Sequence, residues 1–548
     1  MSSSSAEHAT LPSSHPSPRW SSALLPTATE TTKLTEILRC TVLPTAEETD
    51  AFRGVSSDTA ADLARYDAEI ASLQSLLGRL KSERELLHAH TNRCRSVLSP
   101  IRGLPAELLV EIFDMCTPPC ANLIGDNDTV DMEIERLAKT HLLQLSAVCY
   151  RWYQTVMGSP KLWAVVVTDA DLWNEIDVPT EHLLGRLELS LKRGANAPLV
   201  MQLALPEDED LESSILELVS QHAHRWRDVY LWIQPSSIAL LAKIRGNLPR
   251  LESFSLSAST FDPYPPGPAV FDLAPRLKNF TLTGWPLRLP EIPWAQLLDV
   301  KFLSNQASDI TSGLDILSLL QRGAEYRMDL DCAIVSLDNV VSKPIVSHLS
   351  TFTVVFQVVI DGSFSQSIFR NLMESVTMPS LRGLYICRDP TGPPSFWPHA
   401  AFLSFAKRSS LNTHLTDLEI QVEIQDRELI ECLELIPLLG RLVLWDCGDD
   451  NGNAVLTDFL LDRLACTEGQ PNLVPRLEYC YFRTILRFSD ESLDGFIRFR
   501  VGCQEEKAFE IDFTLRPTRE RAFTPEFLGQ MEQLQKCRKL FFTIEDIA

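Results

Sequence analysis

The chain has 548 residues, of which 45% are hydrophobic, and a formal net charge of −23 at pH 7. This length exceeds what one compact core accommodates, so we expect several units or an elongated array. The acidic excess argues against nucleic acid, whose phosphates are bound by clusters of Lys and Arg. No apolar run reaches the ~20 residues that cross a bilayer, so a membrane is not an expected partner either.

Residues 1–57 are expected to form a flexible N-terminal region. The first residues are rich in Ser, Pro and Thr, a composition typical of disorder. They also lack the basic and apolar segments of a secretory signal peptide. The thirteen cysteines are scattered, and the closest pair is Cys116 and Cys120. An odd, dispersed set fits a reducing compartment, so we expect a cytoplasmic or nuclear protein.

Residues 58–98 are predicted to form one long helix, with an N-cap supplied by Ser56-Ser57-Asp58. Apolar residues recur in steps of three and four, broken only by Arg84: Leu63, Tyr66, Ile70, Leu73, Leu77, Leu80 and Leu87. This heptad spacing is typical of a coiled coil, although Gly78 costs about 1 kcal/mol relative to Ala. Two interpretations remain open: a homodimer through 58–98, or a helix that folds back on its own chain.

Residues 104–163 are predicted to contain two amphipathic helices and a closing tryptophan. Pro105 suits the first turn of the first helix, whose apolar residues are Leu104, Leu108, Leu109, Ile112, Phe113 and Cys116. The second helix is expected to carry one apolar stripe: Leu145, Val148, Cys149, Trp152 and Val156. We expect it to end with Gly158 as a left-handed cap and Pro160 preventing continuation. The acidic insert 117–140 is expected to be a solvated loop or a short extra helix.

These residues resemble the F-box, the helical module that docks onto the Skp-family adaptor of cullin–RING ubiquitin ligases. The resemblance lies in Leu104-Pro105, Glu107-Leu108, Ile112-Phe113, Leu145, Val148-Cys149, Arg151-Trp152, Pro160 and Leu162-Trp163. The family usually joins the two halves by a connection shorter than 117–140. With the preceding heptad helix, the chain resembles F-box proteins of mushroom-forming fungi. The resemblance implies an adaptor-binding surface of Leu104, Pro105, Leu108, Ile112, Leu145, Val148 and Trp152.

After Trp163, the sequence alternates strand-like and helix-like segments. Strands are expected at 165–167 and 199–205, with a helix at 183–191 between them. A strand motif of the form L-x-x-L-x-L then returns as Leu251-Phe254-Leu256, Leu277-Phe280-Leu282, Leu297-Val300-Phe302, Leu349-Phe352-Val354, Leu381-Leu384-Ile386, Leu415-Leu418-Ile420, Leu439-Leu442-Leu444 and Leu477-Cys480-Phe482. Weaker copies are Trp226-Val229-Leu231, Glu325-Met328-Leu330, Ala508-Ile511-Phe513 and Cys537-Leu540-Phe542.

A strand and helix that recur in this way are typical of a leucine-rich-repeat solenoid, whose units bury their apolar faces by stacking. An irregular α/β domain is the alternative. The expected fold class is therefore mixed α and β. It comprises an N-terminal coiled-coil helix (58–98), a helical F-box-like module (99–168) and an irregular α/β leucine-rich-repeat-like solenoid (169–548).

The sequence offers no catalytic, cofactor-binding or metal-binding motif. It lacks phosphate-binding glycine loops, a His-Glu-x-x-His pair and a Gly-x-Ser-x-Gly elbow. Asp126-Asn127-Asp128 lacks the central Gly of a calcium loop. Cys149 lies on a predicted apolar stripe, where a thiol usually packs rather than reacts. We therefore expect a non-catalytic protein without a cofactor.

Two functions from different classes fit these features. The resemblance implies a substrate receptor of a cullin–RING (SCF-type) ubiquitin ligase: 104–163 binds the Skp-family adaptor and the repeats bind an unidentified target protein. A rigid solenoid would raise the effective concentration of that target near the ubiquitin-charged partner. The alternative is a coiled-coil and solenoid interaction scaffold without a ligase, in which 104–163 only caps the solenoid.

Overall fold

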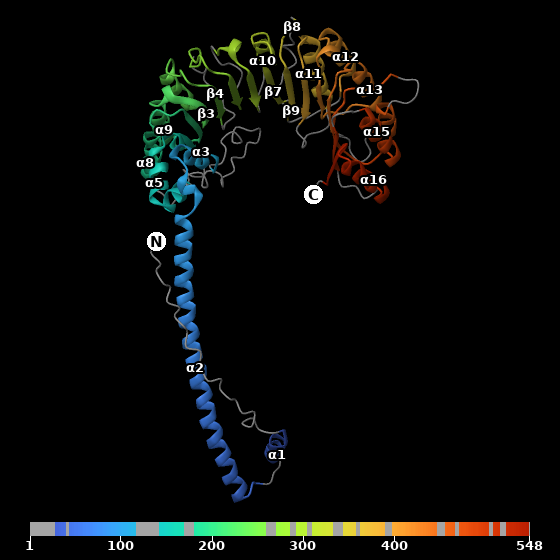
Figure 1. The fold of residues 1–548 in the computed structure, drawn as a ribbon. Coiled ribbons are helices and arrows are strands. Elements are labelled where there is room, and N and C mark those ends of the chain that lie inside the picture. The colour runs from blue at the N-terminus through green and yellow to red at the C-terminus, as the bar shows by residue number, and fades with distance from the viewer. Residues whose placement is uncertain are drawn as a thin grey trace, which may run out of the picture. The chain divides into compact units, whose positions relative to one another are not determined.

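The computed structural model describes residues 28–39, 43–116, 142–168, 180–258, 270–284, 292–303, 310–331, 344–357, 362–388, 397–445, 455–465, 471–503, 508–515 and 522–546. The predicted insert 117–140 therefore lies outside the described residues. The chain divides into two compact units, Met1–Leu104 and Pro105–Ala548. Within the described residues it is a mixed α and β protein, as predicted, and it contains one large parallel sheet (Figure 1).

The first unit contains α1 (Ala28–Arg39), α2 (Ala46–Val97) and a 3-10 turn, η2 (Pro100–Gly103). The long helix begins earlier than predicted because Thr45 and Glu48 form a capping box. The Thr45 hydroxyl accepts a hydrogen bond from the Glu48 N–H, and the Glu48 carboxylate accepts one from the Thr45 N–H at 2.9 Å. The expected cap at residues 56–58 is therefore wrong, since these residues lie inside α2. Within the region expected to be flexible, residues 28–39 and 46–57 are helical.

The second unit opens with a helical module, residues 105–163. Its described helices are α3 (Ala106–Cys116), the helical residues 142–148, α5 (Tyr150–Gly158) and α6 (Pro160–Trp163). The single predicted second helix is wrong. Cys149 has an extended backbone (φ −162°) and separates Leu145 and Val148 from Trp152 and Val156. Gly158 is the last residue of α5 rather than a left-handed cap, and Pro160 occupies the first turn of α6, where its missing N–H costs nothing.

The main sheet of this unit has fourteen strands among the described residues, all paired in parallel and ordered along the sheet as they are along the chain. The strands are β1 (Val165–Thr168), β2 (Leu199–Ala204), β3 (Trp226–Ile233), β4 (Ser253–Ala258), β5 (Asn279–Thr283), β6 (Asp299–Leu303), β7 (Glu325–Asp331), β9 (Thr351–Gln357), β11 (Gly383–Arg388), β12 (Asp417–Ile420), β13 (Arg441–Trp445), β14 (Tyr479–Thr484), β15 (Phe509–Leu515) and β16 (Leu540–Asp546). Two short strands, β8 (Ile345–Val346) and β10 (Val376–Thr377), pair separately.

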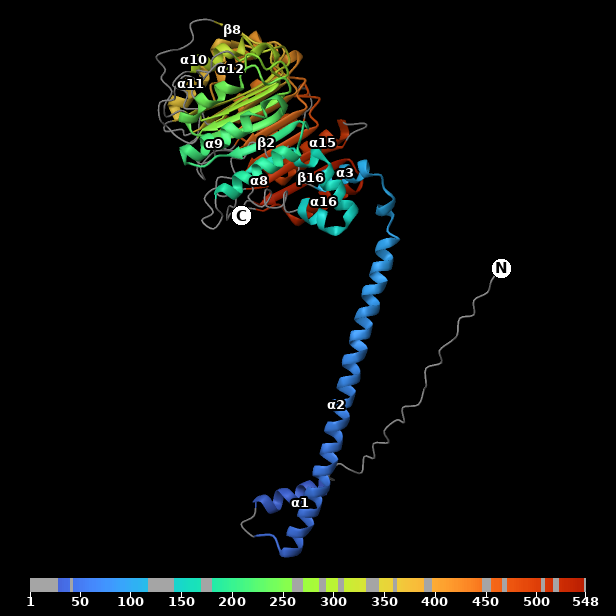
Figure 2. The ribbon, with the colours of Figure 1, turned by 90° about the vertical axis from the view of Figure 1, so that its left-hand side faces the viewer.

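Helices connect successive strands and lie along the outer side of the curved sheet, as the two views of this unit show (Figures 1 and 2). The described helices are α8 (Thr180–Arg193), α9 (Glu209–Ser220), α10 (Ile310–Leu317), α11 (Gly362–Ser375), α12 (His399–Arg408), α13 (Asp426–Glu434), α14 (Asp458–Leu464), α15 (Asp490–Cys503) and α16 (Pro525–Lys536). Short 3-10 segments are η4 (Ala223–Arg225), η5 (Pro235–Ile244), η6 (Trp294–Gln296) and η8 (Leu411–Thr413).

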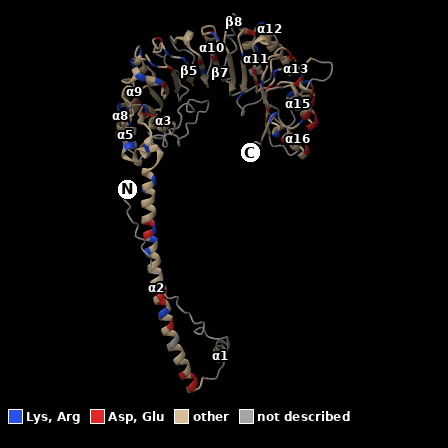
Figure 3. Cartoon of the chain, viewed as in Figure 1, with Lys and Arg blue, Asp and Glu red and all other residues tan. Residues whose placement is uncertain are grey.

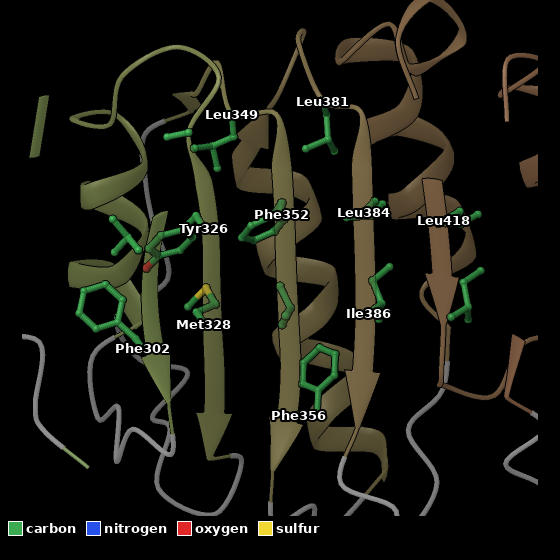
Figure 4. Close-up of a cluster of buried hydrophobic side chains, with 14 of the residues drawn as sticks. Phe302, Tyr326, Met328, Leu349, Phe352, Phe356, Leu381, Leu384, Ile386 and Leu418 are labelled. Atoms are coloured by element: carbon green, nitrogen blue, oxygen red, sulfur yellow. The ribbon is translucent and has the colours of Figure 1, made fainter. Parts of the chain in front are cut away.

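The repeated motif builds the core between the sheet and the helices. Its last two positions fall on a strand in all eight strong copies, and they stack in register, for example Phe352 beside Leu384 and Leu384 beside Leu418. These side chains are fully buried and point toward the helices (Figure 4). For two of the weaker copies of the motif, the predicted alignment with the neighbouring strands is wrong by two residues. Tyr326, not Met328, pairs with Phe352, and Phe542, not Leu540, pairs with Ile511.

A buried arginine stabilises one of the connections. Arg500 of α15 donates hydrogen bonds at 2.8 Å to the backbone carbonyls of Leu464, Leu473 and Val474. Val474 has a positive φ of 45°, an uncommon conformation for a β-branched residue. The guanidinium thus joins three carbonyls around this connection, and the Val474 carbonyl also accepts a hydrogen bond from the Leu477 N–H at 3.2 Å.

Candidate functional site

Helix α3 is apolar on two faces, and among the described residues only one of these faces is covered. Leu109 and Phe113 are fully buried, whereas Leu108 is 50% exposed and Met115 is 84% exposed. Ile112 lies between these groups and is partly exposed. A helix with one buried face and a second apolar face open to solvent is suited to bind another protein.

The segments after the insert repeat this division. Val156 of α5 is buried, and Trp152 packs on Phe113 with ring centroids 4.8 Å apart. Leu143, Val148, Tyr150 and Tyr153 are instead exposed. We use the name "exposed module set" for Leu108, Met115, Leu143, Val148, Tyr150 and Tyr153.

The seven predicted adaptor-binding residues therefore differ in exposure. Pro105, Leu108 and Val148 are exposed, whereas Leu104, Ile112, Leu145 and Trp152 are only partly exposed. Spacing alone could not separate them, because both faces of α3 are apolar. Met115, Leu143, Tyr150 and Tyr153 were missed because they lie outside the motif, and their exposure depends on how the helices pack.

Contacts around α6 hold the helices of the module together and connect the module to the first repeat. Lys161 of α6 forms ion pairs with Glu111 at 3.1 Å and Asp114 at 2.9 Å of α3. Hydrogen bonds from its ammonium to Asp114 and then Glu111 raise the pKa of Lys161. The Trp163 indole N–H donates to the Val156 carbonyl at 2.8 Å, and the Arg193 guanidinium of α8 lies 4.5 Å from the Trp163 ring centroid. The buried Trp163 thus connects the module to the first repeat.

A second candidate surface lies on the sheet face that points away from the helices, which we call the open face. Along β9, for example, Thr351, Thr353 and Val355 alternate with the buried Phe352 and Val354. A cavity of about 410 Å³ crosses this face between β6 and β12. Its lining residues are Asp299, Lys301, Glu325, Tyr326, Arg327, Thr351, Thr353, Tyr385, Cys387 and Glu419.

The two cationic side chains that line the cavity both form ion pairs with acidic residues. Lys301 lies 3.7 Å from Asp299, and Arg327 lies 3.0 Å from Asp329. Glu325 is exposed at the same face, so it contributes a carboxylate that a ligand can reach. The arrangement therefore favours a ligand that carries positive charge.

The cavity is not arranged for nucleophilic chemistry. Burial, and secondarily Glu419, raises the pKa of the Cys387 thiol, so the thiol stays protonated near neutral pH. Burial and then Asp417 raise the pKa of Tyr385 in the same way. Both groups act here as neutral hydrogen-bonding side chains.

A second grouping has the order of a nucleophile, a base and an orienting carboxylate. His399 Nε2 lies 2.8 Å from Glu431, and His399 Nδ1 lies 3.9 Å from Cys432 Sγ. Burial raises the pKa of the Cys432 thiol, however, and its side chain is fully buried. A substrate cannot reach this sulfur, so the contact is a packing interaction.

The described part of the chain contains no group of three or more His, Cys, Asp or Glu residues that could hold a metal ion. None of its described helices combines the length and apolarity needed to cross a membrane. No family model matches the chain, and no curated protein does.

Proposed function

We propose that this chain is the substrate-receptor subunit of a cullin–RING ubiquitin ligase. The helical module acts as an F-box that binds the Skp-family adaptor, and the large sheet unit acts as a leucine-rich-repeat-like solenoid that binds the target. The observation that carries the proposal is the exposed module set on α3 and the following helices. It consists of large apolar side chains that the described residues leave exposed, as a constitutive docking surface requires.

The rigid connection around Trp163 supports the same function. A receptor must hold its target at a fixed place relative to the adaptor, because a rigid link raises the effective concentration of the reacting groups. The Lys161 ion pairs hold α6 on α3 within the module, and the contact of Arg193 with Trp163 links α6 to the first repeat of the same compact unit.

The target is proposed to bind on the open face around the 410 Å³ cavity. The reachable carboxylate of Glu325 favours a target segment that carries Lys or Arg, and Tyr385 offers an aromatic surface beside it. The targets would be identified as the proteins that accumulate when the gene is deleted. A Glu325→Lys variant should still bind the adaptor but should no longer capture these proteins.

Adaptor binding is tested by pull-down of the full-length chain with a purified Skp-family adaptor. Leu108→Asp and Val148→Asp should each abolish capture, since each buries a charge in an apolar interface. Leu189→Asp is the matched control, because Leu189 of α8 is 45% exposed and lies outside the module. Equal capture by all variants, or no capture by the unmodified chain, would contradict the proposal.

An interaction scaffold without a ligase remains the second candidate function. It is favoured by the heptad spacing that the sequence predicts for 58–98, because such a helix would assemble copies of the chain without any adaptor. Absence of adaptor binding together with self-association of the full chain would support it.

A further inference from the structure

Helix α2 exposes a row of apolar side chains that nothing within the described first unit covers. Leu63, Ile70, Leu73, Leu77, Leu80 and Leu87 are between 51% and 69% exposed. We call these six residues, together with Tyr66 and Arg84, the α2 seam. In heptad positions, Leu63, Ile70, Leu77 and Arg84 occupy a, whereas Tyr66, Leu73, Leu80 and Leu87 occupy d.

The α2 seam can pair with the same seam of a second copy that runs in the opposite direction. In an antiparallel pair each a residue faces a d residue of the other helix. With the two-fold axis beside Ser75, every seam residue faces another one in the partner: Leu63 with Leu87, Tyr66 with Arg84, Ile70 with Leu80 and Leu73 with Leu77. The match extends outward, since Thr59 faces Thr91, Ser56 faces Cys94 and Phe52 faces Leu98.

A parallel pair would be worse at two places. It would place Arg84 against Arg84 of the other copy inside the seam, where two like charges repel with little water between them. It would also place Asp62 beside Asp67 of the other copy at the flanking g and e positions. In the antiparallel pair, Arg84 instead meets the aromatic ring of Tyr66, which attracts a cation.

Charge along α2 points the same way. Residues 46–70 contain seven acidic and two basic residues, whereas residues 71–97 contain five basic and two acidic residues. In Figure 3 the ribbon of α2 is coloured red for acidic residues at its N-terminal end. Only an antiparallel arrangement sets the acidic half of one helix against the basic half of the other.

Flanking pairs are mostly favourable in this arrangement. Asp67 faces Lys81 at the e positions, and Asp62 faces His90 at the g positions. Glu69 faces Glu83, but Arg79 lies 3.7 Å from Glu83 within its own helix and offsets that charge. The partly buried Leu76 meets its own copy across the axis and adds apolar contact.

We propose that α2 is a self-association surface that pairs antiparallel with α2 of a second copy of this chain. The helix is about 78 Å long at 1.5 Å per residue, so the pair is long enough to be stable. The C-terminal ends of the two helices then point in opposite directions.

Crosslinking of the full chain tests the orientation. Cys94 is exposed, and Ser56→Cys places a thiol opposite it in the antiparallel pair. Within one helix these positions are about 57 Å apart, so a short bis-maleimide can join them only between two copies. We expect peptide mass spectrometry to identify a link between the thiol introduced at position 56 and Cys94.

Ser57→Cys, one residue off the seam, is the control and should crosslink weakly. A dominant link from Cys94 to Cys94 in the unmodified chain would overturn the proposal.

A charge exchange provides a second test by analytical ultracentrifugation. Asp67→Lys should raise the dimer dissociation constant roughly tenfold, because it sets the introduced ammonium against Lys81 twice per dimer. Asp67→Lys with Lys81→Asp should restore it. A parallel pair predicts the opposite sign for Asp67→Lys, since the introduced ammonium would then face Asp62. A chain that stays monomeric at high concentration would also overturn the proposal. Circular dichroism confirms that each variant keeps its helix.

Discussion

Leucine has opposite surroundings in the two units of this protein. In the sheet unit the motif leucines are buried, and Leu418 has no exposed surface. In α2 the seam leucines are exposed, and Leu87 keeps 69% of its surface in solvent. The same apolar side chain thus stabilises one unit from within and leaves the other incomplete.

In a repeat array, each repeat covers the apolar face of its neighbour, so the array needs no second chain to bury its leucines. Each strand of the main sheet has the next strand of the same chain beside it, so apolar faces are covered as the array grows. A lone helix has no such neighbour, and its apolar stripe is stabilising only when a partner covers it. The exposed module set on α3 is an intermediate case, with one face buried and one open.

The largest contrast is expected from truncating one apolar side chain in each unit. Phe352→Ala removes a buried ring that stacks 6.1 Å from Tyr326, and should lower the free energy of unfolding by about 3–5 kcal/mol. Leu73→Ala in dilute protein should change it by less than about 0.5 kcal/mol. Urea unfolding followed by circular dichroism measures both. Similar losses would mean that α2 is already covered in the monomer.

A buried charge in the sheet unit should matter nearly as much. Arg500→Met removes the buried side-chain donor that the carbonyls of Leu464, Leu473 and Val474 share, and should cost about 3 kcal/mol. Arg498→Met on the same helix removes only surface contacts, with Asp494 at 2.7 Å and Gln530 at 3.2 Å, and should cost less than about 1 kcal/mol. Equal unfolding midpoints for the two variants would show that the Arg500 hydrogen bonds contribute nothing.

The sheet unit should also carry a pH dependence that comes from one buried carboxyl group. Burial raises the pKa of Glu212 in α9 despite hydrogen bonds from the Ser237 hydroxyl at 2.6 Å and the Gln234 N–H at 2.8 Å. A carboxyl whose pKa is raised on folding stabilises the fold when protonated. That stability is lost as pH rises from about 4.3, the unfolded value, through the folded pKa.

Glu212→Gln should remove this loss. The variant should unfold at a higher temperature than the unmodified chain at neutral pH, and the difference should vanish near pH 4, close to the unfolded pKa of Glu. Glu217→Gln, on the exposed side of the same helix, is the control. Scanning calorimetry at several pH values checks it, and a difference that grows as pH falls would contradict the sign.

The smallest effect is expected in α2 itself. A Cβ added at Gly78 meets no atom within 4 Å, and position 78 lies off the seam. Gly78→Ala should therefore stabilise the helix by about 1 kcal/mol. Slower amide exchange around residue 78, with the dimer dissociation constant unchanged or lower, would agree. Weaker association would indicate that this face contacts the partner.

Much of the sheet could be predicted because local spacing determines it. Strands are marked by alternation, and the leucines that enter each strand are buried in all eight strong copies. The predicted register was wrong where several apolar residues of one strand could each occupy the core position. Around β7, Tyr326, Met328 and Leu330 all suit the core, and only pairing with Phe352 selects Tyr326.

The candidate site could be predicted only in part. Its location followed from the motif, but the break at Cys149 did not, because residues 145–156 fit one continuous helix. Packing of Trp152 on Phe113 accompanies the break and leaves Val148 exposed. The cavity on the open face draws its lining from five strands, and no single repeat contains that information.

Amide hydrogen exchange of the full chain, with and without a purified Skp-family adaptor, tests the central proposal most directly. We expect slower exchange in α3 and residues 142–158 when the adaptor is added, with α2 and the open face unchanged. Unchanged exchange throughout the module, or protection confined to the sheet, would contradict the proposal that this module is an adaptor-binding F-box.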